Sequence, residues 1–597
     1  MEDYQEQYLA HAREIAELSD LYRVTPPDSA GAPQVLREAE ARIARLRQEN
    51  NRLLNAHLFP ALDALLGAPQ ETLDQLDGFA AQLMDWKTNL DVGLYVVIHK
   101  ALLSLQRIRQ NRAGILRELY KLGMGYYYLY MYVSGMDQDA VRTMNFRNEM
   151  LFTEAASYLR FFDEIGDEES RGYIIRSMAN IALCTKDRKK KIAAGRRILE
   201  IIRDPYYRGL APGLPWDVFL SRTHQQMSAN RHELSAGDLN REELAAVLDS
   251  CYEVFNAQQG QERPSIRWLW PLYEMEYSCG YTDAETTLAR LEKLITQAPP
   301  GEYDMSGLYG GIQLPLYYGH MLRDNPRLAD DPIRLRFMAY ASEKMLDTLL
   351  SCPLDCQDNY FFYLIREAVS EYHEFPGCVT YLDLSRHLLQ RFAGALFLRG
   401  RKAGRMLQVL CGAMLDQFPD CFDDIPFLRS LKSPEEKRKA LLDYAEGCGL
   451  YYDFGLLKIN ITRTEQTRSL FDEELEIYQL HCVSGWEDLK NRPSTRRYAD
   501  VALGHHVWYN GSGGYPALYE RNRSDFRQMT DAAALVARML ETPETPMPDL
   551  LREIAAGEGS RFSPIAAAVC MDPDIADKLD AILKSDESAE EPSSPQA

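Results

Sequence analysis

The chain has 597 residues, of which 46% are hydrophobic and 26% charged, and this ordinary globular composition excludes a chain disordered throughout. Its net charge of -21 opposes unspecific attraction to phosphate backbones and anionic lipids, so DNA, RNA and membrane surfaces are not expected as partners. The first residues lack the features of a signal peptide, and no run reaches the ~18 apolar residues of a membrane helix. The 11 cysteines follow no zinc-ribbon or disulfide pattern. A cytoplasmic protein of several domains with buried free thiols is expected.

After an N-terminal segment at residues 1–31, a short heptad pattern opens a region at 32–84 that we expect to be a coiled-coil-like helix and a linker. The seam positions are Leu36, Ala39, Ile43, Leu46, Asn50 and Leu53. A lone asparagine at such a seam favours a two-stranded coiled coil, which predicts a homodimer through residues 36–54. The alternative is one amphipathic helix packed on its own domain, because about three heptads are marginal for a coiled coil.

Residues 85–397 are dominated by helical spacing, and alternating β-branched runs are nearly absent. Two stretches look like versions of one helix pair, the first at 117–167 and the second beginning at SRGYIIRSMANIALC. Small residues beside aromatic ones suit close helix contacts, so the region resembles a tetratricopeptide-like solenoid. A protein partner bound through this region is therefore expected, and a non-repetitive helical domain is the alternative.

The most informative segment is GHHVWYNGSGGYP at residues 504–516, where two adjacent histidines precede a glycine-rich turn. It resembles the signature of the HD-GYP family, helical metal-dependent phosphodiesterases that open cyclic di-GMP. The matching residues are His505 and His506 for the paired histidines, Gly511, Ser512 and Gly513 for the turn, and Tyr515 with Pro516 for the closing dipeptide. The resemblance implies that these turn residues contact substrate, and it predicts an HD-GYP-like domain at 398–584 followed by a disordered acidic tail at 585–597.

Segments on both sides of the motif agree with the same family in order and spacing. GCGLYYDFGLLKINI resembles the segment with the family's HD dyad and puts Asp453 at its aspartate. FDEELEIYQLHCVSGWEDL puts His481 at a further metal-binding histidine, and the downstream helix RQMTDAAALVARML keeps one acidic residue, Asp531. The resemblance implies one or two iron or manganese ions held by Asp453, His481, His505 and His506, with Asp453 also serving catalysis.

These residue types suit the reaction that the family performs. Hydrolysis of a phosphodiester near neutral pH requires a metal ion that activates water, and positive charge that stabilises the developing oxyanion. Histidine nitrogen and carboxylate oxygen are ligands for iron and manganese, and a bridging carboxylate can hold two ions ~3.5 to 4 Å apart. Because the ligands come from separate helices, a site inside a helical bundle is expected.

Several positions depart from the family's pattern. Tyr452 replaces the histidine of the dyad, and a neutral tyrosine is a poor ligand for divalent ions. Leu456 stands where the family has a lysine that assists the substrate phosphate. Val507 stands in place of a glutamate, and Gln528 in place of the first aspartate of the downstream helix. These losses favour a degenerate site with at most a partial set of metal ligands.

Three hypotheses follow, and all predict an all-α protein. The favoured one is a bacterial signalling protein whose degenerate HD-GYP-like domain is non-catalytic and either senses a nucleotide, such as a cyclic dinucleotide, or binds a partner; it predicts no stoichiometric metal and no turnover. The second is an active metal-dependent phosphodiesterase that hydrolyses cyclic di-GMP or a related phosphodiester. The third is a helical scaffold that dimerises through its coiled coil.

Overall fold

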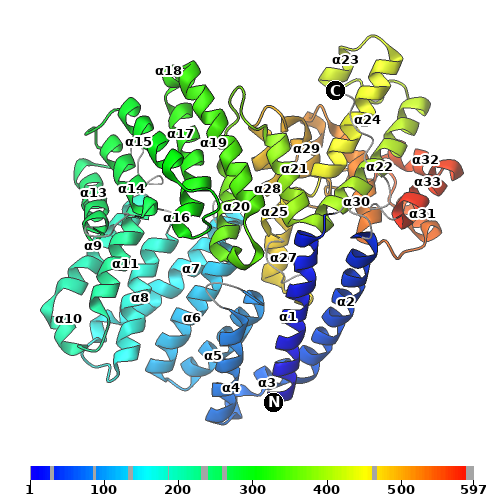
Figure 1. The fold of residues 1–597 in the computed structure, drawn as a ribbon. Coiled ribbons are helices and arrows are strands. Elements are labelled where there is room, and N and C mark those ends of the chain that lie inside the picture. Colours follow the sequence, from blue (N-terminus) through cyan, green and yellow to red (C-terminus); the bar gives the residue numbers. More distant parts are fainter. Residues whose placement is uncertain are drawn as a thin grey trace. The chain divides into compact units, whose positions relative to one another are not determined.

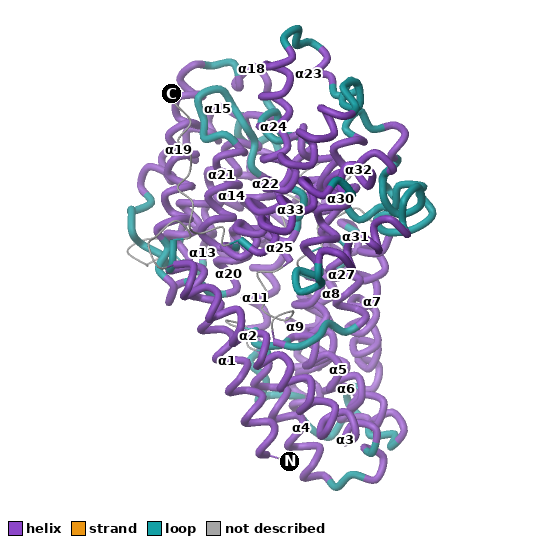
Figure 2. Tube along the Cα trace, turned by 90° about the vertical axis from the view of Figure 1, so that its right-hand side faces the viewer, coloured by secondary structure: helices purple, strands orange, loops and turns teal. Residues whose placement is uncertain are grey.

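The computed structural model describes residues 2–26, 32–84, 89–131, 133, 139–185, 187–229, 239–258, 265–459 and 467–585. These residues form helices joined by turns (Figure 1), and Figure 2 shows no β-strand among them. The expectation of an all-α protein is therefore confirmed. Within the same residues, none of the helices combines the length and the apolar character that a membrane crossing needs. Most of the acidic tail, at 586–597, lies outside the described residues.

Contacts divide the chain into two compact units. Unit 1 comprises Met1–Ala10 and Asn50–Val379, and unit 2 comprises His11–Glu49 and Thr380–Ala597. The domain boundary expected after residue 397 falls inside one long helix of unit 2, Gly394–Gln417. The N-terminal residues 11–49, expected to belong to separate segments, are part of the same unit as the C-terminal third.

Unit 1 consists of helices that follow one another closely along the chain. Its longer helices are α4 (Gln70–Leu83), α5 (Val92–Ile108), α6 (Arg112–Tyr130), α7 (Asp139–Ser157), α8 (Glu168–Cys184), α9 (Arg188–Arg203), α11 (Trp216–Ala229), α13 (Arg241–Asn256), α14 (Ile266–Ser278), α15 (Ala284–Gln297), α17 (Leu314–Asp324), α19 (Pro332–Ser351) and α20 (Asn359–Glu371). Its short elements are η1 (Leu54–Leu58), α3 (Phe59–Asp63), η2 (Leu65–Gly67), η3 (Tyr158–Phe161), α10 (Pro205–Leu210), α16 (Met305–Leu308), η4 (Tyr309–Gln313), α18 (Pro326–Ala329) and η5 (Leu354–Cys356).

The sequence starts many of these helices with a polar cap. The side chains of Asp91, Asn111, Asp167 and Asp187 each accept a hydrogen bond from the backbone N–H three residues later, which satisfies a donor that the first turn leaves open. From α4 to α15, helices close in the chain pack side by side, and α6 also contacts α8 (Figure 1). A helical array is thus observed where helix pairs were expected, and its likeness to the tetratricopeptide repeat stays a prediction.

Unit 2 is a helical bundle. Its longer helices are most of α1 (Glu2–Val24) and α2 (Ala32–Leu53), then α21 (Tyr381–Phe392), α22 (Gly394–Gln417), α24 (Pro434–Tyr451), α27 (Asp472–Gln479), α28 (His481–Lys490), α30 (Arg527–Glu541), α31 (Met547–Ala556) and α33 (Pro573–Lys584). Its short elements are α23 (Pro426–Arg429), α25 (Leu456–Ile459), η6 (Arg496–Tyr498), α29 (Ala499–Gly504), η7 (Arg521–Arg523) and α32 (Pro564–Cys570).

The heptad seam of α2 is covered by α1 of the same chain. Ile43 and Leu46 pack against Ile15 and Leu18, and Leu46 is completely buried. The two helices run side by side in both views (Figures 1 and 2). The structure matches the second interpretation of this pattern, an amphipathic helix packed within its own chain. A dimer through residues 36–54 would require α1 to leave the seam.

Two glycines allow α22 and α24 to cross at backbone contact. A Cβ atom on Gly449 would lie 2.0 Å from the backbone nitrogen of Gly404, so any side chain there would push the helices apart. The close crossing brings Arg399 of α22 to Asp453, which follows α24, with 3.4 Å between Nη2 and Oδ2. The crossing of the two helices therefore places the positive charge of Arg399 beside Asp453.

A further glycine positions the turn after α24 against α28. A Cβ atom on Gly455 would lie 2.0 Å from the carbonyl oxygen of His481 and 2.7 Å from the backbone nitrogen of Gly485. Only glycine permits this approach. As a result, Asp453 and the first residue of α28 meet inside unit 2.

Candidate metal centre

The structure brings together the side chains that the sequence indicated as metal ligands. Asp453 lies in the turn between α24 and α25, His481 is the first residue of α28, and His505 and His506 directly follow α29. Asp453, His481 and His505 are exposed by 2%, 0% and 1%, so they meet in the interior of unit 2. Three separate parts of the chain thus contribute to one buried cluster.

Three acceptor atoms converge at the centre of this cluster. Oδ1 of Asp453 lies 3.3 Å from Nε2 of His481 and 3.2 Å from Nε2 of His505. The two Nε2 atoms are themselves 3.2 Å apart. The three atoms therefore form a nearly equilateral triangle with sides of 3.2–3.3 Å.

Backbone carbonyls determine which ring nitrogens carry hydrogen. Nδ1 of His481 lies 2.7 Å from the carbonyl oxygen of Tyr478, and Nδ1 of His505 lies 3.0 Å from that of Ala502. Because a carbonyl oxygen only accepts, each Nδ1 donates, and a neutral ring then has a bare lone pair on Nε2. Two lone pairs and a carboxylate oxygen repel one another unless a cation lies between them. The donor set fits a divalent metal ion, and in its absence a shared proton.

Neighbouring charges and hydrogen bonds shift the pKa values of Asp453 and His505. Burial alone would raise the pKa of Asp453, but Arg399 and hydrogen bonds from His481 and His505 outweigh burial and hold that pKa well below its usual range. Burial opposes the charged form of His505, but adjacent Cys482 and the hydrogen bond to Asp453 outweigh it and raise its pKa to about 9. Asp453 is therefore a permanent anion, which Arg399 and protons on His481 and His505 compensate when no metal ion is bound.

His506 lies at the edge of the cluster. Its ring centre is 4.2 Å from that of His505, and its ring stacks on Tyr515 at 4.6 Å. Nδ1 of His506 lies 3.3 Å from Oε1 of Glu541, and its side chain is 13% exposed. Burial, together with the positive charge of His505 and His481, lowers the pKa of His506 to about 2. His506 is consequently neutral and retains a lone pair for a metal.

Cys482 is a donor that the sequence did not single out. Its thiol is fully buried, and Sγ lies 3.4 Å from Nε2 of His481 and 4.0 Å from Nε2 of His505. Ligand atoms of Cys482, His481, His505 and His506 all fall within 4.8 Å of one another. Adjacent residues of a helix normally point in different directions. The neighbouring positions of His481 and Cys482 therefore did not indicate that both side chains would meet at one site.

The far side of Asp453 already faces a protein cation. Oδ2 lies 3.4 Å from Nη2 of Arg399, whose guanidinium also lies 5.8 Å from the ring centre of Tyr452. Burial raises the pKa of Tyr452 well above its usual value, so this side chain stays a neutral phenol. Tyr452 is thus a group that does not ligate divalent ions, beside an arginine that compensates the carboxylate.

The glycine-rich turn folds back on itself next to the histidines. Gly511 and Gly514 have positive φ angles of 72° and 81°, which the sequence GSGG permits at low cost. The N–H of Gly511 donates to the carbonyl of Trp508, and the N–H of Ser512 to the side chain of Asn510. These predicted substrate-binding residues therefore use their N–H groups within the turn.

Other predicted turn residues differ in their distance from the cluster. Tyr515 contacts it directly, because its ring lies 4.6 Å from the ring centre of His506 and 6.1 Å from that of His481. Gly513 lies beneath the Trp508 ring, and Pro516 is half-buried behind Tyr515. Of the turn, Tyr515 is the residue that joins the metal cluster.

Asp531 is engaged elsewhere in unit 2. Oδ1 accepts a hydrogen bond of 2.8 Å from Nε of Arg521, and the two groups form an ion pair. Among the described residues, Asp531 forms no hydrogen bond or ion pair with Asp453 or with the histidines. Leu456, at the position of the family's lysine, is buried and supplies no charge.

A second group of candidate ligands lies in unit 1. Asp77, His99 and Glu118 have ligand atoms within 4.8 Å of one another. However, Lys121 pairs with Asp77 at 2.5 Å, and Arg117 pairs with Glu118 at 2.8 Å. Both carboxylates thus have a protein cation at closer range than the 3.4 Å between Arg399 and Asp453, so this cluster is less suited to a metal ion than the cluster of unit 2.

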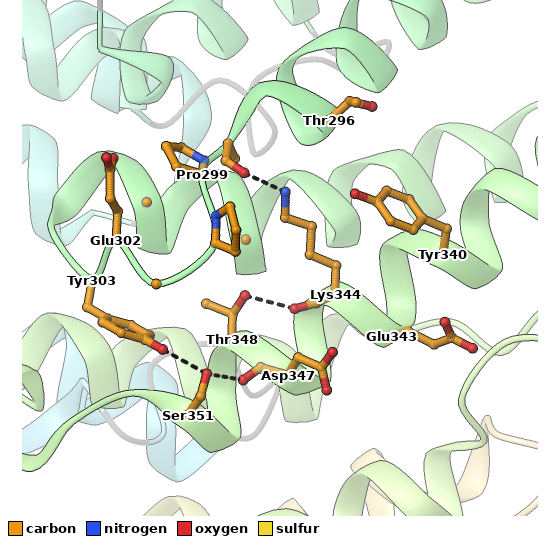
Figure 3. A pocket seen from close by; sticks show the side chains of 15 residues that line it. Thr296, Pro299, Glu302, Tyr303, Tyr340, Glu343, Lys344, Asp347, Thr348 and Ser351 are labelled. Carbon is orange, nitrogen blue, oxygen red and sulfur yellow. Dashed lines mark hydrogen bonds between the residues drawn. The ribbon is translucent and has the colours of Figure 1, made fainter.

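Unit 1 also contains a cavity of about 290 Å³ that lies beside the π-helix η4 and is lined in part by α19 (Figure 3). Lys344 points to its upper wall in Figure 3 and donates to the carbonyl oxygen of Ala298 at 2.7 Å. Its lining includes Tyr303, Glu343 and Asp347. The walls combine aromatic, acidic and hydroxyl side chains with the Lys344 ammonium, which donates to the backbone carbonyls of Ile295 and Ala298.

Comparisons of the chain with models of protein families, with curated proteins and with solved structures found no match. The likeness to the HD-GYP family therefore depends on the residues themselves and stays a prediction.

Proposed function

We propose that unit 2 is a degenerate HD-GYP-like module of a signalling protein, which binds one divalent metal ion and does not hydrolyse cyclic dinucleotides. Asp453, His481 and His505 would hold the ion, with His506 or Cys482 beside them. The observation that carries the proposal is the convergence of three buried acceptor atoms within 3.2–3.3 Å. Without a metal ion, protons on His481 and His505 compensate Asp453, and a divalent ion would take the place of those protons.

The surroundings of Asp453 support one metal ion and not two. A carboxylate that bridges two ions uses both of its oxygens, and here Oδ2 faces Arg399 at 3.4 Å while Oδ1 faces the histidines. Arg399 is permanently charged, so it disfavours a second cation on the same oxygen by direct repulsion. Hydrolysis of a phosphodiester by a pair of metal ions is therefore not expected.

The side chains that would assist hydrolysis are also missing or engaged. Leu456 is apolar, Tyr452 is a neutral phenol, and Asp531 is paired with Arg521. A bound metal ion would supply Lewis-acid stabilisation of negative charge, but the chain offers no charged group of its own to the leaving oxygen at these positions. Loss of several such groups together removes most of the stabilisation of a transition state. We infer a binding or sensing role.

Binding and turnover of cyclic di-GMP test this proposal separately. We expect calorimetry on metal-loaded protein either to detect binding of cyclic di-GMP, which defines a nucleotide sensor, or to detect none, which leaves a partner-binding module. In both cases we expect no linear product after prolonged incubation with iron- or manganese-loaded protein. The matched control is His387→Ala, because His387 is exposed and bonds to a carbonyl of its own helix. Turnover that His505→Ala abolishes and His387→Ala retains would establish the alternative, an active phosphodiesterase.

A protein partner for unit 1 remains part of the proposal. The cavity of Figure 3 supports it, because aromatic and carboxylate groups such as Tyr303, Glu343 and Asp347 suit a basic side chain of a peptide. Isothermal titration with a tetra-arginine peptide tests this idea. We expect weak binding that Asp347→Asn reduces and that the exposed control Glu285→Gln does not, whereas equal binding by both variants would indicate unspecific attraction.

A further inference from the structure

Cys482 has an environment that a buried structural cysteine does not need. Its sulfur is enclosed beside two imidazole Nε2 atoms, at 3.4 Å from His481 and 4.0 Å from His505. The other described cysteines are free thiols in the packed interior or partly exposed, and only Cys482 belongs to a group of potential metal ligands. The family resemblance assigns no role to this position.

We propose that Cys482 is the fourth metal ligand, so that Asp453, His481, Cys482 and His505 form a closed four-coordinate centre for zinc or a similarly thiophilic ion. This inference rests on the proposed metal-binding function and specifies its metal class. Thiolate favours zinc, cobalt and related ions over manganese, which prefers oxygen ligands. A centre with four protein ligands has no open position for water and acts structurally or in binding.

The distances fit a tetrahedral arrangement. Bonds of ~2.0–2.1 Å from nitrogen and oxygen to zinc put the corners of a tetrahedron ~3.3–3.4 Å apart, and a ~2.3 Å bond to sulfur puts sulfur ~3.6 Å from nitrogen. The three nitrogen and oxygen separations are 3.2, 3.2 and 3.3 Å. The two sulfur to nitrogen separations, 3.4 and 4.0 Å, fall on either side of the ideal value. These five separations are close to tetrahedral values, and Asp453 would complete the centre through its contacts with the two histidines, in place of His506, whose ligand atom lies within 4.8 Å of those of Cys482, His481 and His505.

His506 is the competing fourth ligand. Its ring is held by stacking on Tyr515, and Nδ1 points to Glu541 at 3.3 Å. Cys482 is fully buried, whereas the side chain of His506 is 13% exposed. The geometry points to sulfur inside the centre and to His506 as a neighbour that packs over it.

Cobalt substitution of the full-length protein distinguishes the two ligands without an activity assay. We expect one equivalent of Co²⁺ to give the intense visible bands of a tetrahedral ion and a thiolate-to-cobalt charge-transfer band in the near ultraviolet. Cys482→Ala should lose the charge-transfer band, while His506→Ala should keep it. The matched control is Cys570→Ala, since Cys570 is a buried thiol on α32 outside any ligand group, and it should keep the wild-type spectrum.

Metal competition gives a second readout. We expect Cys482→Ala to weaken zinc binding by more than the ~10–100-fold that loss of an outer-shell partner costs, and to change manganese binding much less. A wild-type cobalt spectrum without a charge-transfer band, or one unchanged in Cys482→Ala, would overturn the assignment of Cys482 and leave the metal site intact. Failure of the wild-type protein to bind cobalt or zinc at all would overturn the metal site itself and this inference with it.

Discussion

The Nε2 atoms of His481 and His505 lie 3.2 Å apart, although both rings direct Nδ1 to backbone carbonyls. Neutral imidazoles in this arrangement present two lone pairs to each other, and Asp453 adds a third acceptor. The backbone holds each ring in place, so protons on the two rings relieve the repulsion when no metal ion is bound, and a divalent ion would displace them. This relationship is the physical basis for a metal site in unit 2.

Replacement of Arg399 tests the charge balance around Asp453. We expect Arg399→Met to destabilise the metal-free protein by about 2 kcal/mol, because a buried carboxylate loses a cation. This is less than the ~3–5 kcal/mol of a fully buried pair, since the Arg399 side chain is 31% exposed. Urea unfolding measures the difference. The control is Arg386→Met, at an exposed position of α21, and equal midpoints for the two variants would contradict this role of Arg399.

Two helical glycines should respond oppositely to a methyl group. Gly449→Ala places its Cβ 2.0 Å from the backbone of Gly404, so we expect a loss of at least about 3 kcal/mol, and weaker metal binding because the helix that positions Asp453 is displaced. Gly78→Ala in α4 meets nothing within 4 Å and should stabilise by about 0.5–1 kcal/mol through helix propensity. Thermal unfolding compares them. Similar tolerance of both substitutions would show that α22 and α24 do not cross as described.

Because α1 and α2 belong to one chain, shortening a buried side chain between them should lower stability by an amount that does not depend on protein concentration. Leu46→Ala should cost about 2–5 kcal/mol, because Leu46 is fully buried beside Ile15. Since the partner helix belongs to the same chain, the unfolding midpoint should not depend on protein concentration. Unfolding at two concentrations, with sedimentation of both proteins, makes the comparison. A midpoint that rises with concentration, and a wild-type dimer that Leu46→Ala dissociates, would instead support pairing between chains.

Glu553 gives an expectation for pH dependence. It accepts hydrogen bonds of 2.8 Å from Nε and Nη2 of Arg538, and Arg561 lies 3.0 Å away. The hydrogen bond with Arg538 lowers the pKa of Glu553 below its ordinary value of 4.5, against the smaller effect of burial. A carboxyl whose pKa is lower in the folded state stabilises the fold above that ordinary value, and the contribution disappears as pH falls through the folded-state pKa.

We therefore expect Glu553→Gln to cost about 1 kcal/mol near neutral pH and nothing in strong acid. Chemical unfolding of both proteins across the acid range measures this difference. The control is Glu558→Gln, at an exposed neighbouring position, which should leave the stability near neutral pH unchanged. A constant difference between Glu553→Gln and wild type from neutral to acid pH would show that the effect is not one of charge.

The sequence predicted the helical class and three residues that meet in the interior, but not what surrounds them. Helical spacing is a local property, and motif order indicated Asp453, His481, His505 and His506 as a set, of which the first three meet in the interior and His506 lies at the edge. Arg399 lies far upstream, and its approach to Asp453 depends on the crossing of helices at Gly404 and Gly449, which no local pattern encodes. The heptad seam likewise predicted an apolar face on α2, but periodicity does not identify which helix covers that face.

Metal content tests the central claim most directly. The protein should be purified without an affinity tag or chelator, reconstituted with zinc, cobalt, iron or manganese, and measured by elemental mass spectrometry beside the double variant His481→Ala, His505→Ala and the control His387→Ala. We expect about one equivalent of metal in the wild type and the control and none in the double variant, with all three folded. Metal-free wild-type protein after reconstitution, or equal metal in the double variant, would contradict a metal centre at Asp453, His481 and His505.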